Sequence, residues 1–446
     1  MTGPATTAPA STAPAATTPA STTASTPAIL RSLLLGLALA SLAWGAVAAW
    51  TVHQHASAAS QVVTSSEPLS LAAQRMYQAL SDADVTATTA FLAGPPEPLA
   101  VRRHYEADIA RAAADLATLR AAGRGPAGGH LGASLAAISA GLPVYAGYVQ
   151  QAQTYSSLGY PLTGGSFIQV ASEQMHLTLL PAARAIYAQE NASLAAQSAG
   201  ATGLPWVAVA VAFAAAIAVA LVGTQRWLRR RTHRMVNYGL LAGTLAVAVA
   251  VIWLAVAFAA ARSDLQRGLG HGSGPAEVLA RAAIAAQQAR GDEVLNLISR
   301  SGSASFQRDF TAMRNAIGPG RGSLLAAAAA AGSPSGPGAG AVARAARDAR
   351  GWYSVAGQVF RLDLAANYAA ETRLVIGSGP TGSAAGFARL ESDLRRAIAA
   401  DQVVFRSGAT AGSDSFGGLE AVVAAAALVM AAGSAWGLSR RLAEYR

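Results

Sequence analysis

The sequence contains no cysteine, and none of its 33 basic residues is a lysine. Without thiols the chain can form no disulfide, iron–sulfur cluster or zinc–thiolate site, and it offers no thiol nucleophile. Without lysine it has no Schiff-base residue and no lysine for a phosphate-binding loop or a kinase site. Charged residues are only 13% of the chain and hydrophobic residues are 52%, whereas soluble proteins carry about 25% charged residues. This balance predicts a membrane protein.

Four apolar stretches each approach the roughly 20 residues that a helix needs to cross a bilayer. They cover residues 29–50, 204–223, 238–261 and 419–438. The first could also belong to a cleaved signal peptide, although its apolar run and the leader before it are long for one. That leader, residues 1–28, is mostly Ala, Thr, Pro and Ser, and we expect it to be a disordered cytoplasmic tail because it has almost nothing apolar to bury.

Arginines beside the spans predict the orientation, because cytoplasmic loops are rich in positive charge. The short link 224–237 carries five arginines and no acid, and the tail 439–446 carries three more. We therefore place both termini and the link in the cytoplasm of the cell, and the long loops 51–203 and 262–418 outside the cell membrane. The arginines of the link are Arg226, Arg229, Arg230, Arg231 and Arg234.

This basic link has two interpretations. Its arginines anchor the topology and attract anionic lipid headgroups, each with about 1 kcal/mol. Alternatively, Thr232 follows three arginines and is a candidate phosphorylation site beside which a cytoplasmic effector docks. The link is therefore the expected membrane-facing and effector-facing segment.

Each long loop predicts a bundle of four helices. In the first loop, apolar residues recur at steps of three and four, and Gly and Pro clusters separate the segments. These segments are 69–91, 101–119, 131–152 and 168–186. The second loop is expected to be helical over 264–300, 304–318, 340–376 and 384–407, with a low-complexity run at 318–340.

The order of span, bundle and span occurs twice, which favours an internal duplication. A weak local similarity between 164–166 and 381–383 points the same way. Within the third span, Gly239 and Gly243 are four residues apart and would permit close helix contact. The predicted fold is an all-α membrane protein with four transmembrane helices and two extracytoplasmic four-helix bundles.

We expect the turns between the first and second helices, and between the third and fourth, to lie at the membrane-distal tips of the bundles. A partner from outside would meet these tips first. The candidate contact residues are Gly94, Pro95, Pro96, Glu97, Tyr160, Pro161, Gly377 and Pro380.

No motif for catalysis, for a cofactor or for a metal is present. The acid pair Asp82 and Asp84 is two residues apart, so the two side chains should point apart on a helix. The pair Glu106 and Asp108 has the same spacing, and His104 is interpreted as a surface residue. The spans carry no central charge, which argues against a transporter. We therefore expect no enzyme, no catalytic, metal or cofactor site, and no nucleic-acid partner.

A membrane helix that leads into an outer four-helix bundle and back resembles the sensor modules of chemoreceptors and some histidine kinases. The cytoplasmic segments here leave no room for the kinase or signalling domains of those receptors. In architecture and composition over residues 29–438, the chain also resembles an actinobacterial family of four-span proteins. Members of that family partner a glutamine-type solute-binding lipoprotein and a soluble G-type Ser/Thr kinase in amino-acid sensing.

These features predict a non-enzymatic transmembrane sensor. It would read a solute-binding protein or a small ligand outside and relay a helix displacement to a cytoplasmic effector in a kinase pathway. Two alternatives stay open, which are the membrane subunit of an ABC-type mechanotransmission complex and a structural envelope scaffold.

Overall fold

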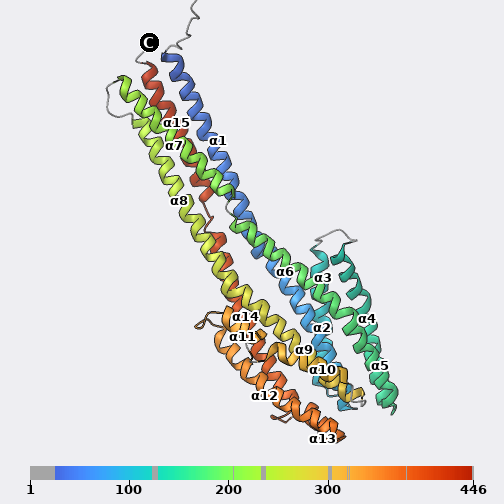
Figure 1. Cartoon of the computed structure of the whole chain (residues 1–446). Coiled ribbons are helices and arrows are strands. Elements are labelled where there is room, and N and C mark those ends of the chain that lie inside the picture. The colour runs from blue at the N-terminus through green and yellow to red at the C-terminus, as the bar shows by residue number, and fades with distance from the viewer. Residues whose placement is uncertain are drawn as a thin grey trace, which may run out of the picture. The chain divides into compact units, whose positions relative to one another are not determined.

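The computed structural model describes residues 26–122, 129–203, 205–232, 238–299, 304–318, 320, 322–377 and 379–443. This part of the chain is helical and contains no strand, which confirms the predicted all-α class. Alanine, the strongest helix former, dominates the long segments. The elements, with η for a π turn, are α1 (Thr26–Gln61), η1 (Val62–Ser66), α2 (Glu67–Ala93), α3 (Leu99–Ala121), α4 (His130–Ser157), α5 (Pro161–Gln174), η2 (Met175–Leu179), α6 (Leu180–Thr202), α7 (Pro205–Thr232), α8 (Tyr238–Gly268), η3 (Leu269–Ser273), α9 (Gly274–Ser299), α10 (Ala304–Ile317), α11 (Leu324–Ala331), α12 (Ala339–Leu364), α13 (Tyr368–Ile376), α14 (Ser383–Asp414) and α15 (Leu419–Ala443) (Figure 1).

Several helical segments are long and apolar enough to cross a membrane, which is compatible with a membrane protein. Among the described residues five segments meet this description: Arg31–Ala93, His130–Ser157, Trp206–Trp227, Tyr238–Ile298 and Ser383–Gly437. Four of them overlap the predicted spans. The other is α4, which the sequence analysis assigns to the first bundle. One face of α4 is buried in a hydrophobic core through Ile138, Tyr145 and Val149.

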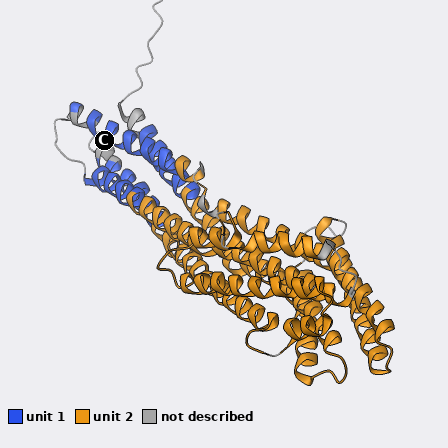
Figure 2. Ribbon diagram, turned by 60° about the horizontal axis from the view of Figure 1, so that its bottom comes forward, with its two compact units in different colours: residues 1–47, 210–251, 423–446 blue, residues 48–209, 252–422 orange. Residues whose placement is uncertain are grey.

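The chain forms two compact units (Figure 2). Unit 1 comprises residues 1–47, 210–251 and 423–446, drawn in blue. Its helices α8 and α15 meet backbone to backbone, since a Cβ atom added at Gly239 would lie only 2.5 Å from the carbonyl oxygen of Gly433 and 2.8 Å from Cα of Gly437. The close helix contact expected at Gly239 is therefore present.

Unit 2 comprises residues 48–209, which we call the first half, and residues 252–422, which we call the second half. Both halves contribute to one hydrophobic core, the first through residues such as Met76 and the second through residues such as Leu279. Helix α2 packs against α9, and Nε2 of Gln288 donates a hydrogen bond of 3.2 Å to the Tyr77 hydroxyl. The two loops, which the sequence analysis treats as separate bundles, thus pack on one another.

Each half begins with a helix that continues through a π turn. The 36-residue α1 runs through η1 into α2, and the 31-residue α8 runs through η3 into α9. A π turn holds one residue more than an α turn and is often found at functional sites. A third π turn, η2, lies between α5 and α6. A π turn after the first helix of both halves agrees with the repeated order of span, bundle and span.

The helix boundaries of the second half differ from expectation at two places. The segment 340–376 is two helices, because Asn367 caps α13 by accepting a hydrogen bond from the backbone N–H of Ala370, as short polar side chains do at helix starts. The low-complexity run contains α11, whose alanines follow the cap Ser323. The composition of these segments indicated neither the break before α13 nor the helix α11.

Candidate functional site

Helix α2 carries the two acids that organise the polar interior of unit 2. Asp82 and Asp84 are two residues apart and engage different partners, so the expectation that they point apart is met. Each acid belongs to a cluster that extends from the first half toward the second. We describe the Asp82 cluster first.

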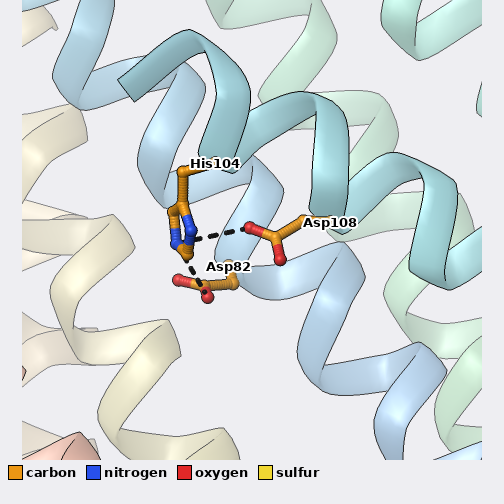
Figure 3. A group of neighbouring side chains, drawn as sticks. All are labelled: Asp82, His104 and Asp108. Atoms are coloured by element: carbon orange, nitrogen blue, oxygen red, sulfur yellow. Dashed lines mark ion pairs between the residues drawn. The ribbon is translucent and has the colours of Figure 1, made fainter. Parts of the chain in front are cut away.

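The Asp82 cluster joins α2 to α3. Nε2 of His104 lies 3.3 Å from Oδ2 of Asp82 and 3.5 Å from Oδ2 of Asp108 (Figure 3). His104 and Asp108 are four residues apart on α3, so both side chains lie on one face of that helix. Asp82 comes from the neighbouring helix, because α2 and α3 pack along their lengths.

Burial and neighbouring charges both shift the pKa of Asp108. Asp108 is fully buried, and burial raises the pKa of its carboxyl, with a further rise from the Asp82 charge. Arg111 offsets part of this effect, since its Nη1 donates to Oδ1 of Asp108 at 2.5 Å. The other oxygen, Oδ2, accepts no hydrogen bond from the described residues and lies 3.5 Å from Nε2 of His104.

Glu391 on α14 brings the second half to this cluster. Burial raises its pKa to about 7, and the Asp82 charge contributes to the same direction. Arg395 and His104 oppose the rise. The protonation of Glu391 is therefore tied to the charge of the first half.

The donor set fits a divalent cation. Asp82, His104 and Asp108 each offer one ligand atom, and these atoms lie within 4.8 Å of one another. One imidazole and two carboxylates are a donor set that suits zinc or manganese. A protonated His104 would neutralise the same two acids without a metal. His104 is an exposed residue, as the sequence analysis expects, but it does not stand alone, because its ring contacts Asp82 and Asp108.

A cavity of about 370 Å³ lies beside the cluster, between the two halves. Asp82 and Gln287 line it, together with Glu391. Its basic lining consists of Arg75, Arg111, Arg395 and Arg406. These arginines are engaged by acids: Arg75 by Asp115, Arg111 by Asp108, Arg395 by Glu391 and Arg406 by Glu67. All four arginines that line the cleft are therefore held in ion pairs.

The second acid, Asp84, is buried among three donors. The hydroxyl of Ser172 donates to Oδ2 of Asp84 at 2.9 Å, and the hydroxyl of Tyr145 donates to Oδ1 at 3.3 Å. Nε2 of His176 lies 3.2 Å from Oδ2. Burial lowers the pKa of His176, but the hydrogen bond and charge of Asp84 and the charge of Asp292 raise it more, so the net shift is upward.

Asp292 extends this cluster into the second half. It belongs to α9, and burial raises its pKa to about 7. The His176 charge lowers that pKa and the Asp309 charge raises it. Like Glu391 in the Asp82 cluster, Asp292 is an acid of the second half whose charge depends on the first.

The second half contains a polar group built on the same plan. Glu293 on α9 accepts hydrogen bonds of 2.7 Å from the Ser383 hydroxyl of α14, and Ser383 accepts one of 2.8 Å from Nε1 of Trp352 on α12. In the first half, Asp84 of α2 likewise accepts hydrogen bonds from a serine and an aromatic side chain, Ser172 of α5 and Tyr145 of α4. Arg290, which is fully buried, completes the second group through Nη1 to Glu293 at 2.6 Å.

The structure places four of the predicted tip residues of the first loop beside the end of α4. Gly94, Pro95, Pro96 and Glu97 line a cavity of about 350 Å³ with the C-terminal end of α4. Tyr160 and Pro161 are exposed at the start of α5. In the second loop, Gly377 follows α13, and the carbonyl oxygen of Pro380 accepts a hydrogen bond from Arg389. Their role in partner contact stays a prediction.

The basic link is described only in part. Arg226 and Arg230 are exposed near the end of α7. Arg229, Arg231 and Thr232 lie in the same helix, but their side chains are outside what the structure describes, and so is all of Arg234. The roles predicted for these residues stay predictions.

Comparison with known proteins gives one match. Residues 58–199 match the family model of an actinobacterial sensor domain. The match covers the first half from the end of α1 to near the end of α6, and therefore the first-half members of the Asp84 and Asp82 clusters. No curated protein and no solved structure matches the chain.

The match fits a sensor protein of actinobacteria, as the sequence resemblance implies, and it indicates a sensing or signalling role. A sensor domain also suggests a non-catalytic role. Sequence reasoning missed the His104 cluster, although the four-residue spacing of His104 and Asp108 was a signal for that pair. The contact with Asp82 depends on how α2 and α3 pack.

Proposed function

We propose that the protein is a multi-pass membrane sensor whose two long loops face outward and detect a solute-binding protein or a small ligand. The observation that carries the proposal is the sensor-domain match over residues 58–199. The helix α1 enters that region from an apolar, membrane-length segment without a break in its helical backbone. A displacement of the sensor region would therefore act on a membrane helix directly.

The polar contacts between the two halves are the proposed two-state element. Asp82 with Glu391, and His176 with Asp292, couple ionisable groups of one half to those of the other. An input must favour one arrangement of helices over another by its differential affinity, since equal affinity shifts nothing. Polar pairs that exchange partners would give two distinct helix arrangements, whereas a purely apolar contact has no specific pairs to exchange.

The proposed output is the cytoplasmic basic link between α7 and α8. The proposal includes a cytoplasmic effector of a kinase pathway docked there, with anionic lipid as the competing partner of the arginines. It also includes cytoplasmic termini and an internal duplication, which the parallel groups around Asp84 and Glu293 support. The glutamine-sensing type of the resembling family is part of this proposal.

Purification from solubilised native membranes tests the proposal. We expect the full-length chain to co-purify with an extracytoplasmic solute-binding protein, and with a cytoplasmic kinase-pathway protein. A co-purifying ATPase would support the alternative of an ABC-type mechanotransmission complex, and envelope proteins alone would support a scaffold.

A matched pair of variants sharpens this experiment. Tyr160→Ala alters an exposed tip residue, and Tyr368→Ala alters an exposed residue at the start of α13. The expected result is weaker recovery of the binding protein with Tyr160→Ala and unchanged recovery with Tyr368→Ala. Equal recovery from both variants would contradict a role of the first tip.

A further inference from the structure

A further cavity lies wholly in the second half, away from the Asp82 and Asp84 clusters. Its volume is about 870 Å³, which is within the range of about 300–1,000 Å³ that is usual for small-molecule sites. Three stretches of chain wall it: the end of α8 with η3, the segment from α11 to α12, and α14. The wall thus includes the low-complexity run.

Most of the lining is apolar. Leu325 and Ala328 come from α11, Val342 from α12, and Val404 from α14. Small residues of the connection between α11 and α12 complete the wall. Such a lining favours a ligand with an apolar body, because burial of apolar surface contributes about 25 cal/mol per Å².

Asp401 is a buried charged residue in this lining. It is buried, with 7% of its surface exposed, and it lines the cavity from α14. Among the described residues it has no hydrogen-bond or ion-pair partner, and burial raises its pKa to about 6. The backbone of Gly338 packs directly against it, since a Cβ atom there would lie 2.7 Å from Oδ1 of Asp401.

The other charged groups of the cavity do not neutralise Asp401. Arg267 is paired with Asp264 on the same helix. Arg350 and His271 are exposed. An ionised carboxylate that is buried without a partner is costly, and a cation supplied from outside would remove that cost.

We propose that this cavity binds a small organic cation with an apolar body, whose charged nitrogen pairs with the Asp401 carboxylate. The binding rests on the cavity alone. Its use as an input of the sensor rests on the proposed function, with the movement passing along α8, which lines the cavity and begins at Tyr238 in unit 1.

The test is direct binding to the full-length chain in lipid nanodiscs, with phenethylamine as the probe. The uncharged 3-phenylpropan-1-ol and the anionic 3-phenylpropanoate serve as matched probes of similar size. We expect phenethylamine to bind at least about tenfold more tightly than either, a difference of about 1.4 kcal/mol. Calorimetry or ligand-observed NMR gives the dissociation constants.

Three variants locate the site. Asp401→Asn keeps the shape of the side chain and should weaken phenethylamine binding at least about tenfold. Ala346→Phe fills the cavity from α12 and should also abolish binding. Asp414→Asn alters an exposed acid of the same helix outside the cavity, and should leave binding unchanged. Circular dichroism of each variant confirms that it is folded.

Three results would overturn the proposal: equal binding of the amine and the alcohol, unchanged binding in Asp401→Asn, or no binding of phenethylamine at roughly millimolar concentration. None of them bears on the sensor function, which the co-purification experiment tests separately. Conversely, probe binding by a chain that recruits no signalling partner would keep the cation site and reject the sensor.

Discussion

His176 is the residue whose charge most directly connects the two halves, since it faces Asp84 on α2 and Asp292 on α9. Its pKa is raised in the folded chain. The stabilisation from its charged form is therefore complete below the unfolded pKa of about 6.5 and is lost as the pH rises through the higher folded value. Asp292, with a pKa of about 7, also favours the folded state more at low pH.

We therefore expect His176→Gln to destabilise the full-length chain more at pH 6 than at pH 8. At pH 6 the loss should be about 1.5–3 kcal/mol, as for a hydrogen bond to a charged group. Thermal unfolding at both pH values measures it. His130→Gln, at the exposed start of α4, is the control. A loss that does not depend on pH would rule out a charged His176.

In the absence of a ligand, Asp401 is expected to destabilise the folded chain at neutral pH, because its buried carboxylate is then charged. Its pKa rises to about 6 on folding, so the folded chain holds this proton more tightly than the unfolded chain does. Its contribution is most favourable below about pH 4 and is lost as the pH rises from about 4 through 6. The charged groups around its cavity are Asp264, Arg267, His271 and Arg350.

Asp401→Asn should accordingly raise the free energy of unfolding at pH 7.5, by up to about 3 kcal/mol. At pH 4.5, where the native carboxyl is protonated, the variant should differ little from the parent chain. Chemical or thermal unfolding without added probe makes the measurement. A variant that is less stable at pH 7.5 would show that the carboxylate has a partner after all.

At the scale of elements, the contact of α8 with α15 depends on glycine. A Cβ atom added at Gly433 would lie 2.7 Å from the carbonyl oxygen of Gly239, so no side chain fits between the two backbones. In contrast, a Cβ atom at Gly36 of α1 would meet nothing within 4 Å. The two glycines occupy helices of the same unit in opposite surroundings.

Gly433→Leu should destabilise unit 1 by about 1–3 kcal/mol or more, which is the usual cost of overpacking. Gly36→Leu should be neutral, or slightly stabilising because glycine is a poor helix former. Thermal unfolding in nanodiscs distinguishes them. If both variants unfold alike, α8 and α15 do not meet through these glycines.

Apolar periodicity predicted the first three helices of the first loop to within about five residues, because each buries one stripe. The fourth predicted segment, 168–186, is the middle of a longer helical stretch that runs from α5 through η2 to the end of α6. The second loop was harder, because alanine tracts give no stripe. The break before Asn367 depends on a single cap, and α11 lies in a run that composition alone marks as irregular. In both places the helix start is marked by a capping side chain, Ser323 for α11 and Asn367 for α13.

The candidate site was mostly beyond the sequence, since it depends on pairs between distant segments. Glu391 meets the Asp82 cluster, and Asp292 meets His176, only because α14 and α9 pack against the first half. No spacing in the chain encodes those contacts. The cavity around Asp401 is likewise walled by three separate stretches.

At the scale of the whole molecule, the lack of cysteine makes the proposed topology easy to test, because single-cysteine variants have no background label. Arg230→Cys and Ser157→Cys place thiols in the link and at the end of α4. A membrane-impermeant maleimide on intact cells should label Ser157→Cys only. Labelling of Arg230→Cys without permeabilisation would reverse the predicted orientation.

The π turns η1 and η3 also set the rotational phase of the helices they interrupt. One residue corresponds to about 100° of rotation in an α-helix, so rewinding the same residues of η1 as ordinary α-helix would turn the helix before it by about that amount relative to the helix after it. In the parent chain, η1 and η3 thus rotate the helix before each of them away from the direction that uninterrupted α winding would give it. If a π turn shifted its position along the helix, the segment between its old and new positions would rotate about the helix axis. The segments on either side would keep their length and direction.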